Sequence, residues 1–132
     1  MSEVFAADSV NNLAGTTVVT TAETAAVTGN FVSPPYQNAK AIVSAVVSLQ
    51  TGTGTTTATI RIRRNPNAEN VVVGGPMTLT LSAGGIFTLS AQAADPIPDG
   101  RSVQYQATVQ QASATGNGST GAANISVFLI SG

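Results

Sequence analysis

The chain has 132 residues, a mass of 13.2 kDa, a formal net charge of −1 and a pI near 5.0, a size that suits one domain. It contains no His and no Cys, which excludes zinc sites built on these residues, disulfides, thiol nucleophiles and triads that need an imidazole base. Charged residues make up only 8% of the chain, against about 25% in an average soluble domain, so the surface is poorly protected against association.

The distribution of apolar and basic residues argues against several classes of partner. No apolar run approaches the ~20 residues that span a bilayer, and the segment from Met1 to Asp8 carries acids where a secretory signal has basic residues. Residues 1–39 contain no Lys or Arg, whereas nucleic-acid binding draws most of its affinity from neutralised phosphates. We therefore expect no membrane partner, no nucleic-acid partner and no export signal.

The first 14 residues are predicted to form an N-terminal arm, followed by a single β domain over residues 15–132. Val4 and Phe5 are among the few large apolar residues of this arm. Such a segment is either a frayed tail or an arm that docks on a neighbouring subunit. We nominate Val4 and Phe5 as contacts for the second case.

Short β-branched runs at residues 16–21 and 24–32 predict the first two strands of the domain, and two prolines end the second run. Residues 41–49 are nearly continuous in apolar side chains, which is typical of a strand covered on both faces or lying centrally in a sandwich. A loop with two glycines follows, and residues 57–64 then alternate strictly between apolar and polar side chains. We predict a hairpin at this loop.

A second hairpin is predicted between residues 77–81 and 86–91, after a short strand at 71–73 that Gly74-Gly75-Pro76 is expected to end. The rest of the chain is predicted to contain a turn-rich connection at 95–100, a strand at 102–111, a small-residue loop at 112–121 and a terminal strand at 123–131.

The whole pattern is all-β, with no helical apolar period sustained over more than two turns. About eight to nine short strands at spacings of roughly 8 to 12 residues predict an antiparallel β-sandwich of jelly-roll or related Greek-key type. The chain has few Lys or Glu residues with which to blunt exposed sheet edges. We therefore expect a homo-oligomer that covers them.

Two motifs have chemical associations but simpler interpretations. Residues 116–121 match G-x-G-x-x-G, yet the following AANISVFLI is typical of a strand, where a dinucleotide site needs a helix N-terminus. We interpret the motif as a flexible hairpin loop, and we expect no cofactor. Asp95 and Asp99 are either turn residues or a carboxylate pair for a cation or for glycoside hydrolysis. The absence of Trp weakens a sugar site.

Arg61, Arg63 and Arg64 are three of the five cations of the chain and lie on or beside one face of one predicted strand. Alternate side chains on a strand stand about 6.6 Å apart, which suits bidentate contacts to carboxylates. The face is either simply solvated or contacts an acidic partner or subunit. As a partner we favour an acidic protein or subunit over nucleic acid, and we expect charge reversal at Arg61 and Arg63 to weaken assembly.

Three segments, taken together, carry a resemblance to a known class of proteins. GTGTTTATIRIRR (52–64), AGGIFTLSAQ (83–92) and VQYQATVQQASATGNGS (103–119) resemble small virion structural proteins of tailed bacteriophages, and most nearly the head decoration, or cement, proteins. The resemblance covers the chain from Ala41 onward and brings no active site. It implies a β-sandwich or jelly-roll protomer, commonly trimeric, that clamps coat subunits on the capsid exterior.

We therefore expect a non-enzymatic structural protein of a virion, made in the host cytoplasm and released by lysis, with its own copies and the major capsid protein as partners. Two alternatives stay open: a receptor- or carbohydrate-binding head of a phage fibre, and a main or minor jelly-roll coat protein. An RNA-packaging coat is disfavoured because the usual basic arm is missing.

Overall fold

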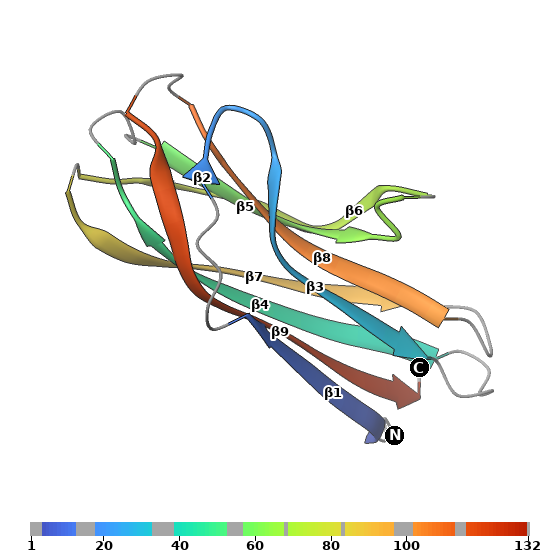
Figure 1. Ribbon diagram of the computed structural model, residues 1–132. Coiled ribbons are helices and arrows are strands. Elements are labelled where there is room, and N and C mark those ends of the chain that lie inside the picture. Colours follow the sequence, from blue (N-terminus) through green and yellow to red (C-terminus); the bar gives the residue numbers. More distant parts are fainter. Residues whose placement is uncertain are drawn as a thin grey trace.

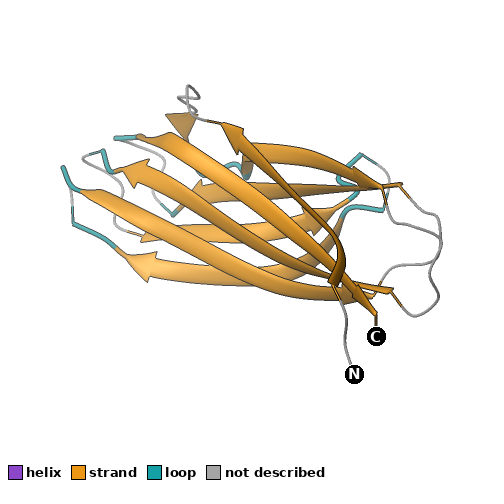
Figure 2. Ribbon diagram, turned by 90° about the horizontal axis from the view of Figure 1, so that it is seen from below, coloured by secondary structure: helices purple, strands orange, loops and turns teal. Residues whose placement is uncertain are grey.

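The computed structural model describes residues 4–12, 18–32, 39–52, 57–67, 69–82, 84–96, 102–112 and 116–131, and strands make up most of this part of the chain (Figures 1 and 2). Among these residues no helix is long and apolar enough to cross a membrane. The strands are β1 (Val4–Asn12), β2 (Val18–Val19), β3 (Thr24–Val32), β4 (Ala39–Gln50), β5 (Thr57–Arg64), β6 (Val71–Thr80), β7 (Ile86–Pro96), β8 (Ser102–Gln111) and β9 (Gly118–Ser131).

The strands form two antiparallel sheets that pack face to face. One sheet has the order β1-β9-β4-β7, with the short β2 also paired to β9, and the other has the order β3-β8-β5-β6. We call them the β4 sheet and the β5 sheet. From β3 onward the chain changes sheet at every connection except that between β5 and β6. This order confirms the predicted antiparallel sandwich and is that of a jelly roll.

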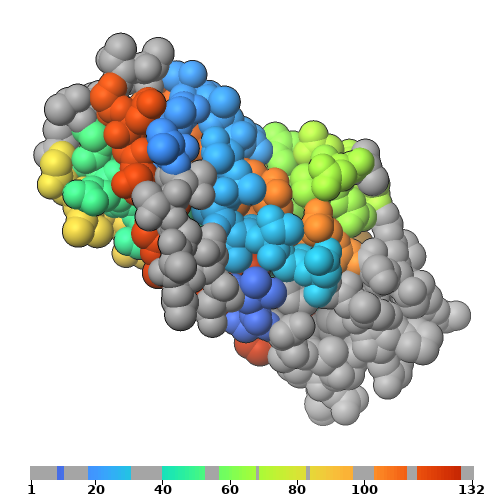
Figure 3. Space-filling model, viewed as in Figure 1, coloured from blue at the N-terminus to red at the C-terminus, as the bar shows by residue number. Residues whose placement is uncertain are grey.

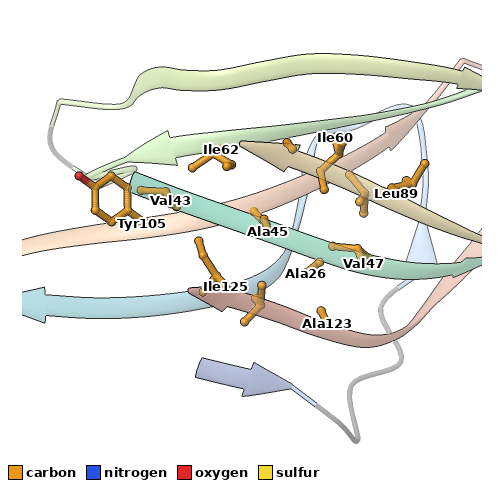
Figure 4. Close-up of a cluster of buried hydrophobic side chains, with 14 of the residues drawn as sticks. Ala26, Val43, Ala45, Val47, Ile60, Ile62, Leu89, Tyr105, Ala123 and Ile125 are labelled. Atoms are coloured by element: carbon orange, nitrogen blue, oxygen red, sulfur yellow. The ribbon is translucent and has the colours of Figure 1, made fainter. Parts of the chain in front are cut away.

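Alternation along the strands places apolar side chains between the two sheets. In β5, Ala58, Ile60 and Ile62 are fully buried, whereas the residues between them are only partly covered. Valine, alanine and isoleucine from β4 and β9 meet them from the opposite sheet, and Tyr105 closes one end of this core (Figure 4). Each fully buried large apolar side chain contributes about 1.5 to 3 kcal/mol before the entropy of folding is subtracted.

Both hairpins predicted from the glycine-rich segments are wrong. β4 and β5 belong to opposite sheets, as do β6 and β7, so each connection crosses from one sheet to the other. The one hairpin between consecutive strands in the described chain joins β5 to β6. Alternation defines which face of a strand is buried, but a short glycine-containing loop can either pair two strands or arch between sheets.

The strand expected to end at Gly74-Gly75-Pro76 instead continues as β6 through Thr80. The pairing of β6 with β5 shifts register here, between Ile60 and Ile62, as in a β-bulge. Since β6 lies at the edge of its sheet, the missing amide of Pro76 removes no bond to a second neighbour. Gly74 packs against β7, where a Cβ would lie 2.9 Å from the carbonyl oxygen of Gln92.

Two other segments are more regular than expected. The predicted turn at 95–100 begins later, because Asp95 and Pro96 belong to β7, and Asp99 lies outside the described residues. Within the predicted N-terminal arm, residues 4–12 form β1, which pairs with β9 along the edge of the β4 sheet. A contact of this segment with a neighbouring subunit stays a prediction.

We expect Ile60→Ala to lower the free energy of unfolding by about 2–5 kcal/mol, because the fully buried side chain leaves a cavity between the sheets. Val71→Ala removes methyl groups from a side chain that is 38% exposed and should cost at most about 0.5 kcal/mol. Urea denaturation of both variants measures the difference, and equal losses would contradict the packing described here.

Candidate interaction surfaces

Glu23, in the short connection between β2 and β3, binds two arginines of the predicted cationic face. Its carboxylate accepts hydrogen bonds from Nε and Nη2 of Arg63, the latter at 2.9 Å, and from Nη1 of Arg61 at 3.3 Å. Arg61 also donates to the side-chain oxygen of Gln110 at 2.8 Å, and Arg63 to that of Asn70 at 3.1 Å. This arrangement ties the β2–β3 connection to the outer face of the β5 sheet.

These contacts lower the pKa of Glu23 below its ordinary value of 4.5. The hydrogen bond from Arg63 is the largest cause, and it outweighs the desolvation that acts in the opposite direction. The same bond raises the pKa of Arg63 above its ordinary value. At neutral pH the group is therefore one carboxylate shared by two guanidinium ions.

Arg64 carries its charge toward the opposite sheet. It donates from Nη1 to the carboxylate of Asp95 on β7, and the Tyr105 hydroxyl on β8 donates to the same carboxylate at 2.6 Å. Asp95 is only 3% exposed and Tyr105 is fully buried, so these bonds join the two sheets inside the molecule. Nη2 of Arg64 also reaches Glu69 at 3.1 Å.

The structure therefore places all three predicted contact arginines in internal ion pairs. A partner contact through them stays a prediction. Charge reversal at Arg61 or Arg63 would add a carboxylate beside Glu23, and it would thus test the fold together with any partner contact. The side chains of Val4 and Phe5 lie outside the described residues.

Asp95 is a buried structural carboxylate, which agrees with neither of the two interpretations considered for the Asp95 and Asp99 pair. Within the described ranges no group of three or more His, Cys, Asp or Glu residues is placed to hold a metal ion. The glycine motif at 116–121 leads directly into a strand, as expected, because Gly118 already begins β9. It is not a hairpin loop, since β8 and β9 belong to different sheets.

The outer face of the β4 sheet has a different character from that of the β5 sheet. We call part of it the neutral face. This part comprises the outward-facing residues of β4 from Ile42 to Gln50 and the outward-facing residues of β7 and β9 that lie beside them; residues paired across the three strands form a row. Within these limits none of its described side chains carries a charge. Its members are Ile42, Ser44, Val46, Ser48, Gln50, Ile86, Thr88, Ser90, Gln92, Ala94, Ser119, Asn124, Ser126 and Phe128.

Three large apolar side chains stand out on the neutral face: Ile86 is 73% exposed, Phe128 46% and Val46 42%. This face was not evident in the sequence, because residues 41–49 are so rich in apolar side chains that they fit a strand covered on both faces. The available signal was Ser44 and Ser48, which share the outward-facing parity of Val46 along β4.

A shallow hollow of about 240 Å³ lies at one end of the neutral face. We call it the Gly121 hollow, and Ser48, Gln50, Ile86, Ser119, Thr120 and Gly121 line it. The pairing of β4 with β9 shifts register between Val47 and Leu49, next to this site. A Cβ on Gly121 would stand 3.4 Å from the Ser48 hydroxyl, so the missing side chain helps to keep the hollow open.

No family model matches this chain, and no curated protein sequence matches it. Solved structures with the same fold include that of the icosahedral infectious bursal disease virus particle, with a TM-score of 0.54 and 8% identity, covering 98% of this chain and 34% of that one. A mutant VP2 protein of the same virus, from T=1 particles, has a TM-score of 0.52 and 8% identity and covers 98% and 35%.

This chain thus spans about a third of the length of those viral proteins. The C-terminal domain of the sugar-binding protein EclA superimposes less well, with a TM-score of 0.47, 12% identity and coverage of 92% and 79%. At these identities the likeness establishes the fold, which is shared by virus-particle proteins.

Acid should destabilise the protein through Glu23. Because the pKa of this carboxyl is lower in the folded state, its contribution is fully present above about pH 4.5 and is lost as the pH falls through the folded value. We expect the unfolding free energy to drop below pH 4.5, and Glu23→Gln to flatten that part of the profile. Urea denaturation from about pH 3 to pH 7 measures both, and parallel profiles would contradict this assignment.

Removing the carboxylate that joins the sheets should be more damaging. Asp95→Ala leaves the Arg64 guanidinium without its buried partner, which we expect to cost about 3–5 kcal/mol in unfolding free energy. Tyr105→Phe deletes only one hydrogen bond to the same carboxylate and should cost about 1.5–3 kcal/mol. Equilibrium unfolding should rank the two variants in this order, and a stable Asp95→Ala protein would disprove the role of the pair.

Proposed function

We propose that this chain is a non-enzymatic structural protein of a virus particle, a capsid decoration or cement protein that bridges coat subunits on the outside of the shell. Its partners under this proposal are further copies of itself, with a trimer as the expected unit, and the major capsid protein. The single observation that carries the proposal is the combination of a jelly roll with the neutral face, which presents no charged side chain among its described residues.

The fold supports an assembly role because the same jelly-roll arrangement occurs in the infectious bursal disease virus proteins, which form particles. A symmetric shell repeats each contact many times, so weak contacts between protomers suffice for a stable assembly. The neutral face supplies hydroxyl, amide and β-branched side chains over three adjacent strands. Such a surface can be covered by another protein without leaving buried charges unpaired.

The ion pairs support a structural role over catalysis. The described carboxylates Glu23, Glu69 and Asp95 are each bound by an arginine. A carboxylate that acts as an acid or base must reach a substrate, and Asp95 is nearly inaccessible. Together with the absence of His and Cys, this leaves few groups for acid, base or nucleophilic chemistry.

The proposal includes the partner contacts nominated from the sequence. Arg61 and Arg63 keep 24% and 21% of their side-chain surface exposed beside Glu23, so a coat carboxylate could approach their outer edges. Val4 and Phe5 lie at the start of β1, an edge strand of the β4 sheet. The arginines lie on the β5 sheet and Val4 and Phe5 on the β4 sheet, so only a partner that spans both sheets could contact all of them.

Immunogold electron microscopy tests the proposal directly. Virus particles are purified from the material in which this sequence occurs and labelled with antibodies against the folded chain. We expect label distributed over the shell exterior, and denaturing electrophoresis should show the chain as a stoichiometric component. Label confined to fibre tips would replace the proposal with the receptor-binding alternative, and particles that lack the chain would overturn it.

A further inference from the structure

We propose that the neutral face binds the same face of a second copy, with a two-fold axis that lies in the interface, crosses the strands and passes through Val46. This inference deepens the proposed function, because it names the surface and the partner for self-assembly. It applies whether the unit that pairs is a single chain or a trimer. An isologous contact of this kind requires one patch to be complementary to itself.

The register of the β4 sheet supplies this self-complementarity. Ile42 pairs with Phe128 of β9, four residues to one side of Val46, and Gln50 pairs with Ser119 and Ile86, four residues to the other side. Exposed apolar side chains thus stand at both ends and in the middle of the neutral face. Serine, threonine, glutamine and asparagine occupy most of the rows between them.

A two-fold axis that crosses the strands at Val46 sets each strand against the same strand of the second copy, with its direction reversed. Phe128 on β9 then lies over the partner's β9 near the row of Ser119, which is at the Gly121 hollow. The operation brings the partner's Phe128 to the corresponding hollow of the first copy. Each exposed phenylalanine therefore gains a recess, and the two Val46 side chains meet at the axis.

The size of the Gly121 hollow fits a side chain. Its volume of about 240 Å³ is below the ~300–1,000 Å³ of typical small-molecule pockets. Ser48, Ser119 and Thr120 line it with hydroxyl groups, and Ile86 supplies an apolar wall, but its lining contains no aromatic ring on which a sugar would stack. Insertion of Phe128 would remove two exposed apolar groups from water together.

The area of the face together with its flanking strands is sufficient for a specific interface. Strands β4, β7 and β9 give a footprint of about 14 Å by 30 Å from a strand spacing of ~4.8 Å and a rise of ~3.3 Å per residue, and β1 and β2, which flank β9, widen it to about 19 Å by 30 Å. Two such footprints bury about 1,100 Å², which passes the ~1,000 Å² expected of a biological contact.

Charge favours this orientation over the other two-fold arrangement. Lys40 also belongs to β4 but lies beyond the row of Ile42. An axis parallel to the strands would set the two Lys40 side chains at the same end of the interface. The axis proposed here puts them at opposite ends, about 40 Å apart, and so avoids the repulsion.

A charge placed at the axis tests the contact. Val46→Glu sets two carboxylates against each other, and we expect at least a tenfold weaker self-association and half the assembly mass in analytical ultracentrifugation. Val72→Glu is the matched control, because Val72 is 39% exposed but lies on β6 of the other sheet, and it should associate like the unaltered protein. A mixture of Val46→Glu and Val46→Lys should regain the assembly.

A covalent trap tests the register. The chain has no Cys, so Phe128→Cys combined with Ser119→Cys introduces the only thiols. Within one copy the two positions are nine residues apart on β9, about 30 Å, whereas a disulfide needs Cα atoms within about 7 Å. Facing Cα atoms of two packed sheets lie about 10 Å apart, so a short bismaleimide is used in place of oxidation. We expect it to link the double variant into a covalent dimer and to leave each single variant largely monomeric on denaturing gels.

Unchanged association in Val46→Glu, a monomer at all concentrations, or no cross-link in the double variant would each overturn the inference. A soluble sugar that binds the Gly121 hollow without effect on mass would also count against it. These results are independent of particle labelling. A chain found on the shell but monomeric in solution would retain the proposed function without this contact.

Discussion

The internal pairing of arginines with carboxylates is the interaction on which the rest of this structure depends. Glu23 holds Arg61 and Arg63 on one sheet, and Asp95 reaches from β7 to Arg64 and Tyr105 of the other. Few charges are present, and those on described strands largely neutralise one another. The bonds to Asp95 join the two layers of the sandwich, and the mutual neutralisation leaves little net electrostatic field at its outer surface.

This use of charge separates the two outer faces. The β5 sheet carries the ion pairs that secure the β2–β3 connection. Figure 3 shows the blue surface of β2 and β3 beside the orange-red start of β9. The neutral face of the β4 sheet carries hydroxyls, amides and isolated apolar groups instead. A protein that lives alone in water normally spreads charge over both faces. The asymmetry suits a component that is covered on one side by its own kind or by a lattice.

Local pattern was a reliable guide to strands and a poor guide to their partners. The limits of β3, β5 and β8 agree with prediction, because alternation along Thr57–Arg64 and Ser102–Gln111 reflects one buried and one open face. The hairpins failed because the same glycine-rich loop serves a turn within a sheet or an arch between sheets. The arginines were located correctly on one strand, but their acidic partners, at Glu23, Glu69 and Asp95, lie up to 40 residues away along the chain.

The amino-acid sequence by itself determined an all-β sandwich without imidazole or thiol chemistry, since composition limits reactive groups and a two-residue period defines a half-buried strand. Only the tertiary structure decided that Asp95 is a buried link between sheets, that Val46, Ile86 and Phe128 share one uncharged face, and that β4 lies between β7 and β9. The physical reason is that burial and ion pairing depend on which distant strands meet, and the side-chain period of a strand does not contain that information.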